Sequence, residues 1–379
     1  MRRLVFELTT VVTVALVLNG CGRKGEEPSG EPMTITLGHV GHDHHTALYV
    51  ALDCAGDYAR KTGIDVNVVE DRKLYRLSEG DKKIADVEIV KVGGGSEMPT
   101  ALAQNVIEVG FGGVAPVLAS IDSGAPIKLI APLHYKGDMF VVRPDFPART
   151  WSEFVAAAKA ADKPLRIGYK DPVACAKVIF EEALRHEGVP FGGTPSQEGI
   201  KVHMVDVKGG GKLNVALSGG LIDGYAGNNP FPAIAVEKGM GRIICDLEDL
   251  PPGTFRNHPC CCIAARADVI ANKPEAVVDL LALFLEANCT INSDLDKTVA
   301  AAVRWIGTSE AVERMSIPTS GYSMEASPQW YNAMGQWSTV MDGLGVFRNQ
   351  LKSKSSDEVA RIAYDFSLLE KAKQRLASH

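Results

Sequence analysis

The feature that most constrains this chain is a strand, loop and helix pattern that occurs twice. Each copy reads as the end of a helix, a small or polar turn, an apolar strand with one acidic residue, and glycine. The two copies are ALAQNVIEVGFGG (101–113) and ALSGGLIDGYAGN (216–228). PLRIGYKDPVACAKVIFEEALRHEGV (164–189) likewise repeats the order of the segment 35–59. Two α/β units of common ancestry are the simplest explanation. Alternating strands and helices predict an α/β fold with a mainly parallel sheet.

The length of 379 residues predicts more than one hydrophobic core. We expect lobe 1 to contain 34–135 plus 255–379 and lobe 2 to contain 136–254. Strands are predicted at 34–40 and 64–70, and a hairpin at 71–92. Helices are predicted at 45–63, 274–292, 296–306, 308–315, 327–342 and 355–377. In doubly wound sheets the loops at the carboxyl ends of the strands face one crevice, so a two-lobed clamshell is expected.

The first residues read as a targeting segment. Arg2 and Arg3 precede an apolar run, VVTVALVL, which is too short to span a bilayer. The run ends in LNGC, which resembles the lipobox of bacterial lipoproteins and implies lipidation of Cys21. We therefore expect a signal peptide at 1–20 and a flexible tether at 21–33. A lipid-anchored protein in the periplasm or on the outer face of the cytoplasmic membrane follows. The net charge of −6 argues against a nucleic-acid partner.

Four of the nine histidines fall within GHVGHDHH, between the first strand and the first helix. Three interpretations stay open. His42, Asp43, His44 and His45 contact a ligand in the crevice, which is favoured. Alternatively, a transition metal is held by His42, His45 and Cys260. In the third interpretation the histidines cap the helix or lie exposed.

Three consecutive cysteines, Cys260 to Cys262, follow His258 and Pro259 on an expected crossover strand. Side chains alternate along a strand, so Cys260 and Cys262 are expected on one face and Cys261 on the other. Small apolar packing is favoured over a soft-metal site, because three cysteines on alternating faces cannot share one ion.

Several segments resemble the periplasmic substrate-binding proteins of the nitrate/sulfonate/taurine class of ABC importers. They are LYVALDCAGDYARKTGIDVNVVE (48–70), GGGSEMPTALAQNVIEVGFGGVAPVLASIDSGAPIKLIA (93–131), ALSGGLIDGYAGNNPFPAIA (216–235) and HPCCCIAARADVIANKPEAV (258–277). The resemblance implies a type II periplasmic-binding-protein fold. It also implies a monomer that captures a small molecule and delivers it to an ABC permease and its ATPase, without a resident cofactor.

HHTALYVA (44–51) and the cysteine triplet are also similar to the pyrimidine-precursor branch of that family, which serves thiamine synthesis. The synthase of that branch consumes a histidine and anchors pyridoxal phosphate on a lysine, but Pro116 and Gly112 stand at those positions. Ala264 replaces the last cysteine of its cluster. We therefore predict a binding protein and no enzyme. The alternatives are a metal- or cysteine-dependent enzyme on the same fold, and an extracytoplasmic ligand sensor.

The predicted crevice loops supply the remaining candidate ligand contacts. These are Gly113, Val114, Tyr135, Lys136, Asp171, Val173, Asn228, Asn229 and Phe231. The loops carry no arginine, and the amides of Asn228 and Asn229 offer both donors and acceptors. A small polar ligand, heterocyclic or anionic, is expected.

Overall fold

The structure is a computed structural model that describes residues 33–94 and 97–378. The predicted signal peptide, the lipidation site Cys21 and the tether up to residue 32 lie outside the described residues. Their assignment therefore stays a prediction.

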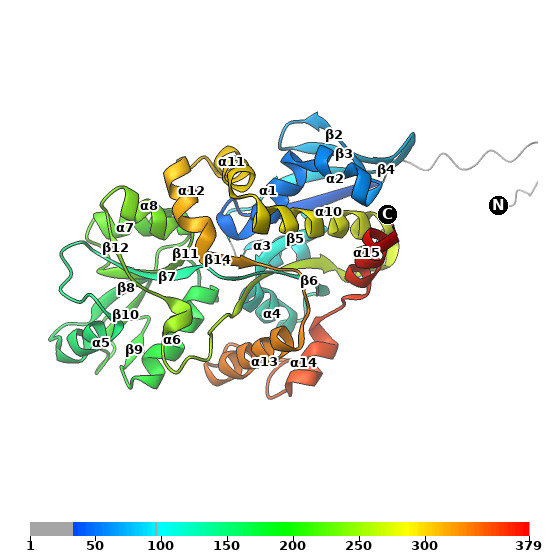
Figure 1. Cartoon of the computed structure of the whole chain (residues 1–379). Coiled ribbons are helices and arrows are strands. Elements are labelled where there is room, and N and C mark those ends of the chain that lie inside the picture. Colours follow the sequence, from blue (N-terminus) through cyan, green and yellow to red (C-terminus); the bar gives the residue numbers. More distant parts are fainter. Residues whose placement is uncertain (1–32, 95–96, 379) are drawn as a thin grey trace, which may run out of the picture. The chain divides into compact units, whose positions relative to one another are not determined.

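The described chain contains two sheets (Figure 1). The first has the strand order β14-β6-β13-β5-β1-β4-β3-β2. Its strands are β1 (Thr34–His39), β2 (Asp65–Glu70), β3 (Leu74–Glu79), β4 (Lys82–Lys91), β5 (Val109–Gly113), β6 (Ile127–Lys136), β13 (Pro259–Arg266) and β14 (Ser320–Tyr322).

The prediction of a mainly parallel sheet is wrong for this first sheet. β1 runs parallel to β4 and β5, but β13 is antiparallel to both β5 and β6. The physical reason is the path of the chain, because it leaves the sheet at the end of β6 and re-enters at that same end through β13. The predicted hairpin is confirmed, since β3 and β4 pair antiparallel around Gly80.

The second sheet has the order β12-β7-β11-β8-β10-β9. Its strands are β7 (Asp138–Val142), β8 (Leu165–Tyr169), β9 (Phe191–Gly192), β10 (Val202–Asp206), β11 (Gly224–Asn228) and β12 (Arg242–Asp246). β8, β9, β10 and β11 are mutually parallel, whereas β7 pairs antiparallel with β11 and β12. All its strands come from the part of the chain between β6 and β13.

Helices cover both sheets (Figure 1). In the first half of the chain they are α1 (Thr46–Asp53), α2 (Ala55–Thr62), α3 (Glu97–Ala103), α4 (Val114–Asp122), α5 (Trp151–Ala160) and α6 (Cys175–His186). Those that follow are α7 (Leu213–Ser218), α8 (Phe231–Glu237), α9 (Ala267–Asn272), α10 (Pro274–Ser293), α11 (Leu295–Ile306) and α12 (Glu310–Ser316). The last are α13 (Pro328–Gly343), α14 (Ser356–Ala363) and α15 (Ser367–Ser378).

Two of the predicted helices are each divided. The helix expected at 45–63 breaks at Cys54 into α1 and α2, and the one expected at 355–377 breaks between α14 and α15. α10 is apolar and long enough to cross a membrane by composition, but 72% of its most apolar window is buried inside the protein. It is therefore the central core helix, packed against α1 and α15.

Candidate functional site

The first candidate site is a cleft of about 540 Å³. It is lined by Val40, Gly41, His42, Lys91, Gly93, Gly94, Glu97, Lys170, Asp171, Pro172, Asp206, Lys208, Gly209, Gly210, Gly211 and Phe231. These residues lie at or after the carboxyl ends of β1 and β4 in the first sheet and of β8, β10 and β11 in the second. Ligands of open α/β sheets bind at this end of the strands.

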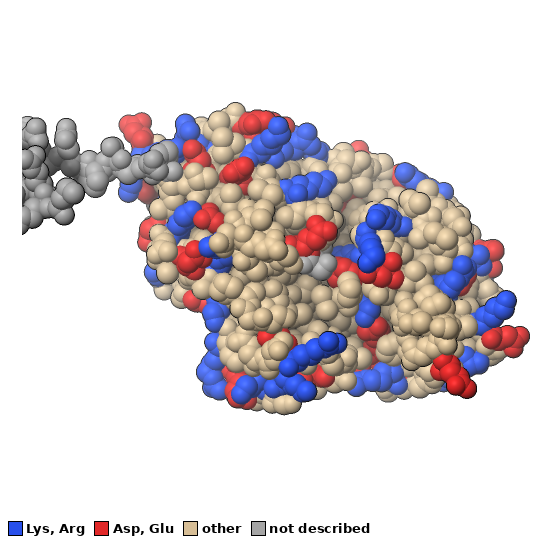
Figure 2. Space-filling view, turned by 180° about the vertical axis from the view of Figure 1, so that it is seen from behind, with Lys and Arg blue, Asp and Glu red and all other residues tan. Residues whose placement is uncertain are grey.

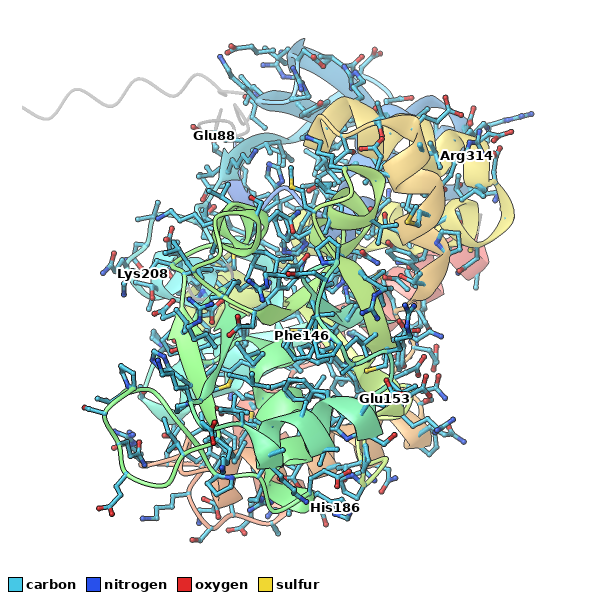
Figure 3. The ribbon with its side chains drawn as sticks, turned by 90° about the vertical axis from the view of Figure 1, so that its left-hand side faces the viewer. Glu88, Phe146, Glu153, His186, Lys208 and Arg314 are labelled. Atoms are coloured by element: carbon cyan, nitrogen blue, oxygen red, sulfur yellow. The ribbon has the colours of Figure 1, made fainter. Side chains whose placement is uncertain are left out.

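The lining carries both signs of charge. Three lysines, Lys91, Lys170 and Lys208, stand among three carboxylates, Glu97, Asp171 and Asp206. Figure 2 shows basic and acidic side chains side by side around a hollow on that face, and Figure 3 shows Lys208 at the rim of the molecule in its view. The ammonium of Lys170 is held by the Asn228 side-chain oxygen at 2.6 Å.

Three buried polar atoms at this site have no hydrogen-bond partner among the described residues. They are Nδ1 of His42, Nε2 of His45 and Oδ2 of Asp171. His45 accepts the Val40 N–H at Nδ1 over 3.0 Å, so its proton lies on Nε2 and offers a donor. Burial lowers the pKa of both histidines and raises the pKa of Asp171. Buried groups of this kind normally have partners, so they are available to a ligand or water.

A second, much smaller pocket of about 20 Å³ adjoins the cleft. His42, Lys170 and Asp171 line both spaces. The inner pocket is further lined by His44, His45, Gly112, Gly113, Pro116, Asp138, Ala174, Cys175, Cys260 and Cys261. Its size suits about one water molecule.

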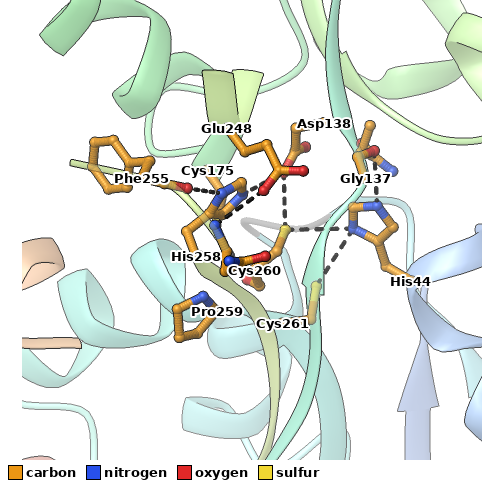
Figure 4. Close-up of polar contacts among 12 residues, drawn as sticks. His44, Gly137, Asp138, Cys175, Glu248, Phe255, His258, Pro259, Cys260 and Cys261 are labelled. Carbon is orange, nitrogen blue, oxygen red and sulfur yellow. Dashed lines mark hydrogen bonds and ion pairs between the residues drawn. The ribbon is translucent and has the colours of Figure 1, made fainter. Parts of the chain in front are cut away.

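A cluster of histidine and cysteine side chains forms part of the wall of this inner pocket (Figure 4). One donor atom from each of His44, His134, Cys260 and Cys261 lies within 4.8 Å of the others. Nδ1 of His44 is 3.4 Å from Sγ of Cys260 and 3.9 Å from Sγ of Cys261. All four residues are buried.

The prediction that Cys261 faces away from Cys260 is wrong. The pairing of β13 with β6 shifts register between Pro259 and Cys261 and again between Cys261 and Cys262. These irregularities interrupt the strict alternation of side chains, as β-bulges do. Cys260 and Cys261 therefore both approach His44, while the thiol of Cys262 donates to the Gly112 carbonyl at 3.6 Å.

A second group shares Cys260 and comprises Asp138 and His258. The Cys260 thiol donates to Oδ2 of Asp138 at 3.1 Å, and Nε2 of His258 is 3.4 Å from the same oxygen. Burial opposes the charge of Asp138, but His258, His44 and Cys260 together hold the pKa of Asp138 below its ordinary value. Asp138 is therefore a buried carboxylate next to the cluster.

The structure brings part of the predicted site together. His42, His44, His45, Gly113, Asp171 and Phe231 line the cleft or the inner pocket. Asp43, Val114, Tyr135, Lys136, Val173, Asn228 and Asn229 line neither. Of the predicted metal ligands His42, His45 and Cys260, Cys260 alone enters a group of clustered donors within the described residues.

Most of the residues outside the lining make other contacts. The Lys136 ammonium pairs with Glu248 at 3.1 Å, and the Tyr135 hydroxyl donates to the Glu325 carbonyl at 3.5 Å. The Asn229 amide donates to Thr319 Oγ1 at 2.7 Å. Asp43 accepts from the Ser316 hydroxyl, and burial with the nearby Glu313 raises the pKa of Asp43.

Sequence reasoning missed the glycine turns of the cleft at 93–94 and 209–211. A signal was present, because GGGSEMPTALAQN and GGGKLNVALSG extend the internal repeat toward the N-terminus of each half. Phe231 packs against Gly210 so closely that a Cβ atom there would clash with its ring. His134 and Asp138 are not among the predicted site residues, although the sequence offers His134 or His258 as a further ligand of a closed metal site and places Asp138 at the crossover between the lobes.

The fold is shared with solved periplasmic binding proteins. A zinc-bound ligand-binding component of an ABC-type import system from Staphylococcus aureus matches with a TM-score of 0.69 and 16% identity, over 90% of this chain and 99% of that one. The nitrate-binding protein of Synechocystis PCC 6803 matches with a TM-score of 0.67 and 14% identity, over 92% and 90% of the chains. The alkanesulfonate-binding protein of Xanthomonas axonopodis pv. citri, bound to MOPS, gives 0.63 and 15%, over 89% and 99%. The two-sheet α/β architecture is thus the periplasmic-binding-protein fold.

The family follows from the sequence match. The model of the NMT1-like family matches residues 29–307, which is more than half of the chain, and the chain belongs to this family. An uncharacterized protein of Methanocaldococcus jannaschii is 32% identical over 135 residues, 35% of this chain and 91% of that protein.

Proposed function

We propose that this protein is the solute-binding component of an ABC importer and captures a small polar solute in the cleft. The observation that carries the proposal is the position of the cleft, because residues after parallel strands of both sheets line it. Its volume of about 540 Å³ lies in the range of small-molecule sites. Solved proteins that share the fold include nitrate- and alkanesulfonate-binding proteins.

The chemistry of the lining favours a solute with both donors and acceptors. Lysines and carboxylates both line the cleft. Asp171 on the cleft offers an unpartnered acceptor, and His45 in the adjoining inner pocket offers an unpartnered donor. A polar heterocycle or a zwitterion satisfies both, whereas a bare oxyanion would face the carboxylates. Each sheet forms one lobe together with its helices. The mechanism is binding of the solute followed by closure of the two lobes around it. Delivery to a permease and anchoring through a lipid on Cys21 complete the proposal.

Native mass spectrometry of the full chain tests this function, with Cys21→Ser to avoid lipidation and no ligand added. We expect an organic adduct that survives a chelator, or, after unfolding and refolding, a rise in melting temperature with one compound of a panel. The panel holds nitrate, taurine, MOPS, pyrimidines and zwitterionic amino acids. Absence of an adduct and of any melting shift with this panel and with small-molecule extract would overturn the proposal.

Substitution of His45 locates the solute. We expect His45→Ala to weaken binding by about 10-fold or more, since a buried hydrogen bond to the solute is worth about 1.4 kcal/mol. His203→Gln, which changes a half-buried histidine outside both pockets whose ring contacts the Gly193 carbonyl, is the control and keeps full affinity. Isothermal titration calorimetry with the identified solute measures both variants. Equal affinity of His45→Ala and the unsubstituted protein would place the solute elsewhere.

A further inference from the structure

The cluster in the wall of the inner pocket has the dimensions of a metal site. A tetrahedral ion with metal–sulfur bonds of about 2.3 Å and metal–nitrogen bonds of about 2.0 Å separates a sulfur from a nitrogen by about 3.5 Å. The separations of His44 Nδ1 from the sulfurs of Cys260 and Cys261 are 3.4 and 3.9 Å. With His134, all four donor atoms lie within 4.8 Å of one another. Small side-chain movements therefore complete the geometry.

The two imidazoles are prepared to donate lone pairs. Nε2 of His44 lies 3.2 Å from the Gly137 carbonyl, so it carries the proton and leaves Nδ1 bare toward the sulfurs. This is the backbone contact that orients metal-bound histidines. His134 is buried, and no hydrogen-bond partner among the described residues reaches either ring nitrogen. A buried imidazole without partners is costly unless something else binds it.

The cysteines are also suited to ligation. Burial opposes ionisation of Cys261, but Cys260, His134 and His44 outweigh it and hold the pKa of the Cys261 thiol well below its ordinary value. Cys260 carries its proton toward Asp138 and would release it on metal binding, as thiol ligands do. Asp138 then remains a carboxylate beside the four metal ligands and does not bind the ion itself.

We propose that His44, His134, Cys260 and Cys261 form a tetrahedral site for a borderline-soft divalent transition metal ion such as Zn²⁺. Two thiolates and two imidazoles exclude Mg²⁺ and Ca²⁺, which take oxygen ligands. Four protein donors in a buried cluster define a closed structural site rather than a catalytic one. The ion joins β13 and β6 to the loop that carries the cleft histidines, and so fixes one wall of the cleft. This site does not depend on the proposed solute or on the permease.

Cobalt substitution of the full chain with Cys21→Ser tests the proposal under reducing conditions. Co²⁺ alone is the probe, and Zn²⁺ is then added to displace it. We expect about one Co²⁺ per chain, thiolate-to-cobalt charge transfer in the near ultraviolet, and intense visible bands of a tetrahedral ion. The double variant Cys260→Ser with Cys261→Ser should lose the charge-transfer bands.

Matched controls separate ligation from loss of fold. Cys262→Ala removes the neighbouring buried thiol, which faces Gly112 instead, and should keep the spectrum. His134→Gln removes no hydrogen bond found among the described residues, so the variant should fold. Its affinity for Co²⁺ should nevertheless fall by more than the ~10–100-fold that is typical when a residue outside the ligand set is changed. His203→Gln, at a half-buried histidine outside the cluster, is its control. The proposal is overturned if charge-transfer bands are absent while the thiols are reduced, or if the bands persist in the double variant. It is also overturned if Cys262→Ala loses the bands to the same extent as the double variant.

Discussion

At the scale of single residues, Gly137 controls the placement of His44. It lies between β6 and β7 with φ of +83°, and a Cβ atom there would clash with the Ser320 hydroxyl and come within 2.9 Å of His44 Nε2. Its carbonyl faces the same ring nitrogen at 3.2 Å. Glycine is therefore required here for both backbone conformation and space.

Gly137→Ala should lower the free energy of unfolding by about 1–3 kcal/mol and weaken Co²⁺ binding, because both φ and the clash oppose the native placement of His44. Gly124→Ala is the control, since Gly124 has φ of +93° but no atom within 4 Å of the added Cβ. Urea unfolding measures the first effect and cobalt titration the second. Equal losses in both variants would show that backbone strain alone matters at Gly137.

At the scale of elements, β13 shows what sequence patterns could and could not predict. The repeat predicts that β13 follows the second α/β unit, and the apolar composition of β13 indicates a buried strand. The strict period of two then separates Cys260 from Cys261, but the register shifts against β6 bring them together. A bulge arises from tertiary pairing and leaves no local sequence mark, so the placement of Cys261 beside Cys260 could not be predicted.

The start of β13 is held by α13. The Trp337 indole N–H donates to the Pro259 carbonyl at 2.8 Å, whereas the Trp330 indole N–H on the same helix is buried with no partner among the described residues. Trp337→Phe should therefore lower the free energy of unfolding by about 1–3 kcal/mol more than Trp330→Phe, because it leaves a buried carbonyl unpaired. Urea unfolding of both variants provides the comparison. Equal destabilisation would assign the whole effect to lost indole volume.

At the scale of the whole molecule, buried neutral histidines set the response to acid. Burial, with His45 and Lys91 nearby, lowers the pKa of His39 from 6.5 to about 3. The unfolded chain then binds one proton more than the folded protein between these values. The stability held by neutral His39 is complete above pH 6.5 and falls as the pH drops toward 3. Burial lowers the pKa of His42, His44 and His45 in the same direction.

We expect the free energy of unfolding to fall below pH 6.5, with His39 contributing up to about 1.4 kcal/mol per pH unit. His39→Gln should flatten the profile by that amount, and His203→Gln, at a half-buried histidine, is the control variant. Urea unfolding between pH 4.5 and 7.5, with chelator present, measures the three profiles. Parallel profiles of His39→Gln and the unsubstituted protein would contradict the assignment.

The repeat allowed the α/β class, the order of the two halves and the first loop of the cleft to be predicted. The repeat also runs through the glycine turns at 93–94 and 209–211, but these walls of the cleft were missed because the turns lack the charged or aromatic side chains that draw attention to a site. The glycine turns contribute exposed backbone groups and space in the cleft. Both depend on how the two sheets face each other. That arrangement is a property of the assembled chain and not of any one segment.

The pairing of β6 with β13 has a topological consequence. The Lys136 N–H donates to the His258 carbonyl at 2.9 Å, so the segment that builds the second sheet begins and ends within one hydrogen bond. Residues 137–257 therefore have the position of a domain inserted at the tip of the two-stranded hairpin that β6 and β13 form. Replacement of this one block would change the part of the cleft that the second sheet supplies while β6 and β13 of the first sheet keep their register.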